Sequence, residues 1–166
     1  MMGISKTRWL IGVERVLLAL WIGGLWVTGY LVVPTLFAIL DDRQLAGLLA
    51  GRIFQTMNYV GLGIGTYLLL SVLIISGEQN FSKKIKGWRV WVLIAMLLII
   101  TVAAFIIQPL MQELKTQGLT EGSAQAAQFG RLHGVSSVLF LINSVLGLIL
   151  VGAGLITKGL ERKIAE

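Results

Sequence analysis

Four long stretches of the chain carry no charged side chain, and short polar connections separate them. The stretches cover residues 16–40, 53–77, 90–112 and 134–157, each 23 to 25 residues long. A helix needs about 20 apolar residues to cross the hydrocarbon core of a bilayer, and helical backbone satisfies its own hydrogen bonds there. The pattern predicts an all-α membrane protein, a single domain over residues 1–166 folded as a bundle of four transmembrane helices.

The composition supports a membrane environment. Hydrophobic residues make up 56% of the chain, charged residues make up 13%, and the mean hydropathy is +0.85. A soluble domain carries about 25% charged residues. The chain has no cysteine, which excludes a disulfide framework, a thiolate zinc site and an iron–sulfur site. We therefore expect a multi-pass protein whose first partner is the lipid bilayer.

The basic residues are distributed unevenly between the two sides of such a bundle. Of the 14 Lys and Arg residues, ten fall in the N-terminal segment, the second connection and the C-terminal segment, and four fall in the first and third connections: Arg43, Arg52, Lys115 and Arg131. Because basic loops stay in the cytoplasm, both termini are predicted to be cytoplasmic. The basic clusters flank membrane segments, which favours contact with anionic lipid headgroups and argues against nucleic acid as a partner.

The two outer connections have helical features. Asp41 or Asp42 suits the N-cap of a helix that begins there. Leu45, Leu48, Leu49 and Arg52 then follow helical spacing, and the small residues at 46, 47, 50 and 51 form one surface. Residues 123–131 also have a helical pattern. We expect short interfacial helices on the outer face or, for the first connection, an extension of the second spanning helix packed closely on a neighbour.

Proline and aromatic positions indicate an internal repeat of two helices. Pro34 and Pro109 are the only prolines, and Phe54 and Phe129 each follow one of them by 20 residues, so that both pairs are offset by 75 residues. Repeats of two spans have the same orientation and are related by an axis along the membrane normal. A true duplication and a chance match between apolar helices both account for the pattern.

Small residues within the stretches predict close approach of helix backbones. The predicted packing positions are Gly23, Gly24, Gly61, Gly65, Gly147 and Gly154. Trp21 and Trp26 lie deep in the first stretch, so we expect both to fill the bundle.

Several of these segments resemble a known family. They are Gly-Gly-Leu-Trp-Val-Thr-Gly-Tyr at 23–30, Pro-Thr-Leu-Phe at 34–37, Ala-Gly-Arg-Ile-Phe at 50–54 and Phe-Gly-Arg-Leu-His-Gly at 129–134. Together they resemble the bacterial four-span family of unknown function that is grouped with transmembrane protein 205-like proteins and, more distantly, with the membrane domain of copper-resistance D-type proteins. The resemblance implies a bacterial inner-membrane protein and carries a weak link to metal handling.

The candidates for ligand chemistry are few. His133, the only histidine, stands at the outer start of the fourth stretch, and Met57 and Met111 fall at the outer ends of the second and third. An imidazole and two thioethers suit Cu(I), and haem would need a methionine partner or a symmetric dimer. The simpler interpretation is that His133 ties helices together and the methionines fill gaps. Under this simpler interpretation no cofactor is expected, and copper or haem is the alternative.

Polar residues within the stretches form the second candidate set, since such residues usually face the bundle interior or a cavity. With His133, a candidate solute-binding cluster comprises Asn58, Gln108 and Asn143. No charged residue lies in a stretch, which argues against a proton-coupled pump. No nucleophile and base are suitably spaced, so we expect no enzyme activity.

Three functions remain open. The first is a structural or accessory subunit that packs against itself, as a homo-oligomer, or against a larger membrane complex through its glycine faces. The second is a carrier or permeation module for a small solute or metal ion, with its site between the two halves. The third is a redox subunit that holds a cofactor or quinone.

Overall fold

The computed structural model describes the backbone of residues 2–74, 87–120 and 122–165, and the side-chain surroundings of 12–72, 87–120 and 122–152. All the described elements are helices. They form four runs, listed here in chain order: α1 (Met2–Val27), η1 (Thr28–Val32) and α2 (Val33–Ile39); α3 (Arg43–Ile74); α5 (Trp88–Val102), η3 (Ala103–Ile107) and α6 (Gln108–Thr116); and α7 (Ala124–Ala165). The predicted all-α class is confirmed for this part of the chain.

Three helical stretches among the described residues are long enough to span a membrane. They are Gly12–Ile39, Trp88–Thr116 and Ala124–Gly152, long and apolar enough to cross a bilayer. These stretches overlap the first, third and fourth predicted spans. α3 contains most of the second predicted span, whose last residues, 75–77, lie outside the described residues. The described helices therefore support a multi-pass membrane protein.

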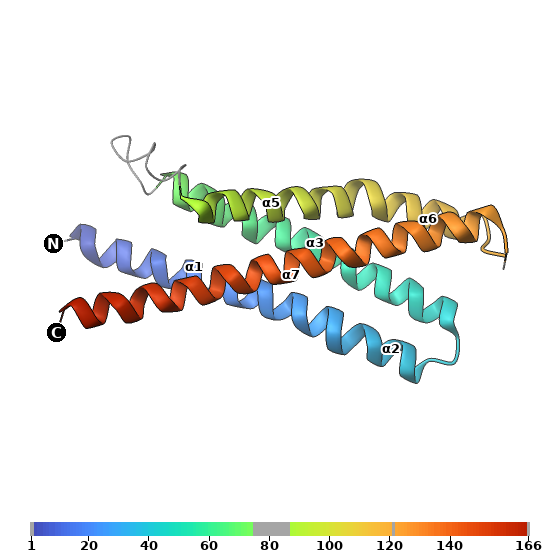
Figure 1. The fold of residues 1–166 in the computed structure, drawn as a ribbon, viewed down its shortest axis with the longest axis horizontal. Helices are drawn as coiled ribbons and strands as arrows, with labels where there is room; N and C mark the ends of the chain where they lie inside the picture. The colour runs from blue at the N-terminus through green and yellow to red at the C-terminus, as the bar shows by residue number, and fades with distance from the viewer. Residues whose placement is uncertain (1, 75–86, 121, 166) are drawn as a thin grey trace.

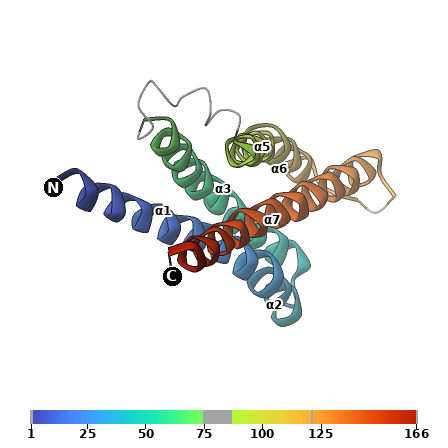
Figure 2. The ribbon, with the colours of Figure 1, turned by 60° about the vertical axis from the view of Figure 1, so that its left-hand side comes forward.

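The four runs lie together as a bundle (Figures 1 and 2). α1 and α5 each pack against both α3 and α7, so the order around the bundle is α1, α3, α5, α7. The start of α1 and the end of α7 lie at one end, which we call the terminal end (Figure 1). The α2–α3 and α6–α7 connections lie at the opposite end, which we call the loop end.

The core is built around one tryptophan. Trp21 of α1 is fully buried and lies against Gly61 and Gly65 of α3, where the missing Cβ atoms make room for the indole ring. The buried side chains that complete this cluster come from all four runs: Ile22, Leu25, Leu68, Leu93, Met96, Ile100 and Leu150. Since lipid is as apolar as these side chains, the contacts stabilise the bundle through dispersion and close fit.

A second group of aromatic side chains lies nearer the loop end. Phe54 of α3 and Phe140 of α7 meet edge to face, with ring centroids 5.2 Å apart. Phe140 also lies close to the backbone of Gly29, where a Cβ would collide with its ring. Trp26 was expected in the interior, but it is 37% exposed and lies 4.6 Å from the ring of Tyr30. The expectation for Trp26 was wrong because this residue does not share the helix face of Trp21.

Two π-helical segments interrupt the runs, and each is followed by a proline. Pro34 lies in the first turn of α2 and Pro109 in the first turn of α6. A proline has no N–H, and its ring clashes with the carbonyl four residues earlier in an α-helix. The wider turn relieves this conflict: the residue before each proline donates its N–H to the carbonyl five residues back, Val33 to Thr28 and Gln108 to Ala103.

The outer connections continue the spanning helices. The Asp42 carboxylate caps α3 by accepting hydrogen bonds from the backbone N–H groups of Gln44 and Leu45, at 2.8 and 3.1 Å. Residues 43–52 are the first turns of α3 and 124–131 those of α7, so the expected separate interfacial helices are absent from these ranges. For residues 43–52 the alternative prediction, an extension of the second spanning helix, is correct. Within residues 43–52, Ala46 and Ala50 are the buried positions.

The six predicted packing glycines have different surroundings. Gly24 lies against Met57, and Gly147 lies against Ile22, while Gly61 and Gly65 hold Trp21 as described above. Gly23 has open space where a side chain would stand. Gly154 lies outside the residues whose surroundings are described.

The fit around Trp21 predicts a specific cost for adding one methyl group. In Gly61→Ala the new Cβ would lie 2.6 Å from Trp21 Nε1 and 3.2 Å from Ile100 Cδ1. We expect the free energy of unfolding to fall by about 1–3 kcal/mol, the usual cost of overpacking. Gly63→Ala, two residues away with nothing within 4 Å of its Cβ position, is the control and should be at least as stable as the parent. Thermal unfolding in one detergent compares them, and equal stabilities would contradict this account of the core.

Candidate functional site

Five polar side chains are buried between the helices in the part of the chain whose side-chain surroundings are described. They come from four different elements: Thr28 of η1, Ser71 of α3, Gln108 of α6, and Asn143 and Ser144 of α7. A polar group inside a membrane protein is costly unless it is paired or serves a ligand. The hydrogen bonds of these residues therefore indicate which of them are structural.

Two buried polar atoms have no hydrogen-bond partner among the described residues. One is a donor, Trp21 Nε1, and the other is an acceptor, Asn143 Oδ1. The neighbouring Ser144 hydroxyl, by contrast, donates to the Phe140 carbonyl at 2.8 Å. An unpaired buried polar atom costs about 1–3 kcal/mol. A polar ligand or an ordered water gains most by binding at these two atoms.

The residues of the predicted solute-binding cluster occupy different surroundings. Gln108 and Asn143 are buried, and Asn58 is half-buried in α3. His133 is exposed on α7, where its ring stacks on Phe129 with centroids 6.1 Å apart and planes 11° from parallel. The structure thus turns two of the four side chains into the interior and leaves the imidazole on the surface.

The predicted copper ligands also have separate neighbours. Met57 lies against Gly24 of α1, Met111 is buried in α6, and His133 rests on Phe129. Within the described ranges, no group of three His, Asp or Glu side chains is placed to hold a metal ion. Copper and haem binding stay predictions.

A carboxylate that lies just before the first charge-free stretch takes part in helix packing. Glu14 of α1 accepts a hydrogen bond from the hydroxyl of buried Ser71 in α3, 57 residues later in the chain. The sequence contains an indication that Glu14 faces the interior. Glu14 precedes Trp21 by seven residues, and positions separated by seven share one face of a helix. This contact joins α1 and α3.

A lysine at the loop end is also drawn into the bundle. Lys115 of α6 is half-buried, and its ammonium group donates to the carbonyl oxygen of Gly47 in α3 at 3.2 Å. The same Nζ lies 5.5 Å from the centroid of the Phe129 ring of α7, a cation–π distance. Lys115 therefore contacts two other helices. The sequence pattern places Lys115 only among the charges of the third connection, and the small residues at 46, 47, 50 and 51 of α3 leave room for its side chain.

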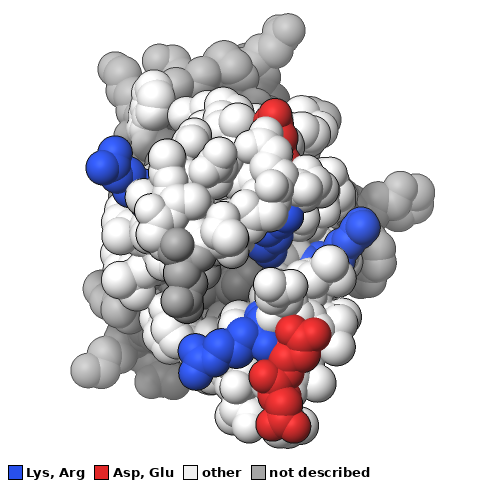
Figure 3. Space-filling model, turned by 90° about the vertical axis from the view of Figure 1, so that its right-hand side faces the viewer, with Lys and Arg blue, Asp and Glu red and all other residues white. Residues whose placement is uncertain are grey.

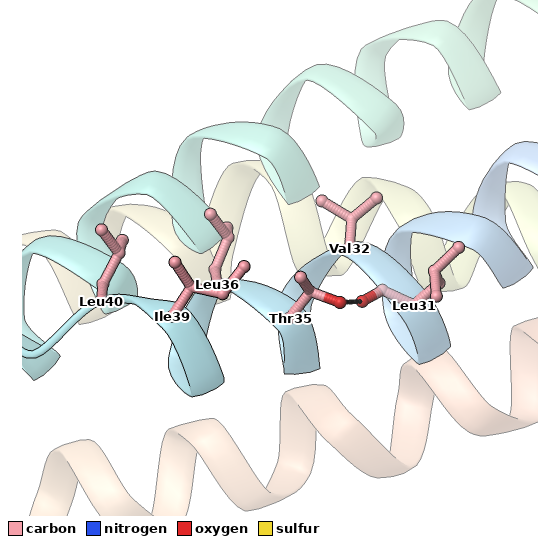
Figure 4. Close-up of a pocket in the computed structure, with 6 residues that line it drawn as sticks. All are labelled: Leu31, Val32, Thr35, Leu36, Ile39 and Leu40. Atoms are coloured by element: carbon pink, nitrogen blue, oxygen red, sulfur yellow. Dashed lines mark hydrogen bonds between the residues drawn. The ribbon is translucent and has the colours of Figure 1, made fainter.

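An apolar groove follows η1 and α2 on the outside of the bundle (Figure 4). Its one hydroxyl, that of Thr35, donates to the Leu31 carbonyl at 2.7 Å within the same helix. The groove therefore offers apolar contact only, as a lipid acyl chain would use. It is lined by Leu31, Val32, Thr35, Leu36, Ile39 and Leu40.

Comparison with known proteins identifies a family but no characterised relative. No curated protein and no solved structure matches the chain. Residues 16–120, from the first charge-free stretch to the α6–α7 connection, match a domain of unknown function, DUF4149. Because this match takes in more than half of the 166 residues, the chain belongs to the DUF4149 family.

Proposed function

We propose that this protein is a non-enzymatic, four-span subunit of the bacterial inner membrane, with both chain ends in the cytoplasm, which assembles with a second copy of itself. The apolar helices and the family support a membrane protein of undefined activity. The four spans and the orientation rest on the charge-free stretches and on the basic loops. The grouping with transmembrane protein 205-like and copper-resistance D-type proteins stays a prediction.

The observation that carries the assembly proposal is an exposed small-residue face of α7. Gly130 and Gly134 are one turn apart and exposed, and nothing lies within 4 Å of either Cβ position. Ser137 continues this face, and its hydroxyl is already bonded to the His133 carbonyl at 2.9 Å. The glycines that contact Trp21 and Ile22, in contrast, are filled from within the chain.

A second copy is the occupant that suits this face best. Small residues one turn apart let two membrane helices approach until their backbones touch, which is a recognised way for identical helices to dimerise. A two-fold axis through such a crossing brings the same two glycines of each copy together. The exposed side chains farther along α7, Val138, Leu141 and Val145, are apolar and match either lipid or a partner helix.

The assembly proposal predicts that one large side chain on α7 separates the copies. Gly134→Leu should weaken self-association by about tenfold or more, because a tenfold change corresponds to only about 1.4 kcal/mol of lost helix contact. Gly23→Leu is the control, since Gly23 is equally open but lies on α1. Energy transfer between labelled copies in lipid vesicles, measured over a range of protein-to-lipid ratios, follows the equilibrium. The proposal fails if both variants associate as the parent does, or if the parent is monomeric.

The orientation has its own test. A green fluorescent protein fused after Ala165 should fluoresce, since it folds in the cytoplasm, and alkaline phosphatase inserted after Gly118 should be active outside it. Gly118 is exposed in the α6–α7 connection, so an insertion there is expected to spare the helices. Phosphatase activity at Ala165 would reverse the proposed orientation.

A second candidate function, a carrier for a small polar solute, is favoured by the unpaired atoms Trp21 Nε1 and Asn143 Oδ1. A 75-residue spacing between corresponding helical features also supports the carrier candidate. η1 and η3 stand 75 residues apart, and at the same offset the buried residues Trp21 and Leu25 correspond to the buried residues Met96 and Ile100. Such a pattern is expected of duplicated helix pairs, whose interface is where carriers bind their solute.

The carrier candidate predicts that Asn143 lowers the stability of the empty protein. Asn143→Leu removes an unpaired buried acceptor, so the free energy of unfolding should rise by about 1–3 kcal/mol. Ser144→Ala, at the adjacent buried position whose hydroxyl is already bonded, should show no such gain. Thermal unfolding in detergent without added solute compares the two. A loss of stability in Asn143→Leu would assign Asn143 to packing and remove the support for a carrier.

A further inference from the structure

The loop end of the bundle holds a positive charge that no described carboxylate neutralises. Lys115 is half-buried between α3, α6 and α7, and its contacts there are a backbone carbonyl, that of Gly47, and the face of Phe129. The nearest acid in sequence, Glu113, accepts its hydrogen bond from Gln117 on the next turn, and the Asp42 carboxylate caps α3. A charge removed from water without a partner is costly unless a counter-charge binds.

Two amides extend this site toward the interior along the same face of α6. Gln108, Gln112 and Lys115 are spaced by four and three residues, which places them one above another on a helix. Gln108 is only 7% exposed, and no side-chain hydrogen bond of its amide is formed within the described residues. Gln112 Nε2 lies 3.5 Å from the Cβ position of Gly51, and Lys115 Nζ lies 3.8 Å from it. The absence of a side chain at Gly51 therefore lets both donor groups lie close to α3.

The basic side chains at the loop end favour an anion beside these donors. In Figure 3, which faces this end, Lys and Arg side chains lie across the middle of the described surface and at its left edge, and the acidic side chains lie above and below them, the lower group directly against a basic side chain. An approaching anion would meet the basic groups at the centre. Neighbouring Arg52 and Arg131 are both exposed, so their charges are screened more strongly than that of Lys115.

We propose that the loop end binds a phosphate group, with the Lys115 ammonium as its counter-charge and the Gln112 amide, backed by Gln108, as further hydrogen-bond donors. Ammonium and amide N–H groups match the several acceptor oxygens of a phosphate, and lysine binds phosphate as a compact point charge. Phe129 covers the other side of the ammonium and keeps it directed toward α3. The phosphate is either the phosphodiester of a lipid headgroup or free inorganic phosphate. The proposal is independent of self-association.

Thermal unfolding of the detergent-purified full chain tests the site, because a ligand that binds only the folded state raises the unfolding temperature in a saturable way. Two probes are titrated separately: inorganic phosphate at constant ionic strength, and phosphatidylglycerol against phosphatidylcholine in mixed micelles. Stabilisation by inorganic phosphate supports a site for free phosphate. Stabilisation by phosphatidylglycerol alone supports a lipid headgroup site.

Matched variants separate this site from general attraction between charges. Lys115→Gln should raise the half-saturating concentration of the effective probe by about tenfold or more, since a charge-assisted hydrogen bond is lost. Arg131→Gln removes an equal charge from the exposed surface of the same end and should change it less than about twofold. Gln112→Leu keeps every charge and should also weaken binding, which provides a test if Lys115→Gln does not fold.

Three results would overturn the proposal. The first is that neither probe stabilises the parent protein. The second is equal weakening by Lys115→Gln and Arg131→Gln, which would mean that only net charge matters. The third is parental binding in Gln112→Leu.

Discussion

The close approach of α1 to α3 depends on the absence of two Cβ atoms. Trp21 occupies the space that side chains at Gly61 and Gly65 would fill, and from there it reaches the α5 side chains beside the same glycines. In a membrane the surrounding lipid competes with every apolar contact, so a helix pair is held by how well its surfaces fit. A large flat side chain in a glycine-lined recess provides such a fit, and α7 then closes the bundle by placing Gly147 on Ile22.

The interior left by this packing is uneven in polarity. Among the described residues, its centre contains a donor and an acceptor without partners. Glu14 is drawn inward toward the terminal end, and Lys115 is drawn inward at the loop end. Buried polar groups in proteins are usually paired, so the unpartnered donor and acceptor are exceptions within the described interior. The three proposals concern different surfaces. Self-association would use the outside of α7, solute binding the interior at Trp21 and Asn143, and phosphate binding the loop end at Lys115.

The sequence predicted well those features that depend on local pattern. Charge-free stretches of sufficient length predicted helices that the structure contains, and an aspartate before small residues predicted the cap of α3. Features that depend on the rotation of one helix against another were predicted poorly. Trp21 and Trp26 are equivalent in hydropathy, and only the three-dimensional arrangement separates the buried ring from the exposed one. Lys115 was counted as a loop charge because nothing local shows that α6 turns it toward Gly47.

The two π turns have a consequence for changes in chain length. An α-helix advances by about 100° per residue, so deleting one residue rotates everything beyond the deletion onto another face. A π turn already contains one residue more than an α turn. Deletion of one residue within Thr28–Val32 or Ala103–Ile107 would convert the wide turn to an α turn while the flanking residues keep their faces. Within the first and third helical runs, such a deletion would therefore leave the flanking faces in place but would restore the clash between each proline ring and the carbonyl four residues earlier.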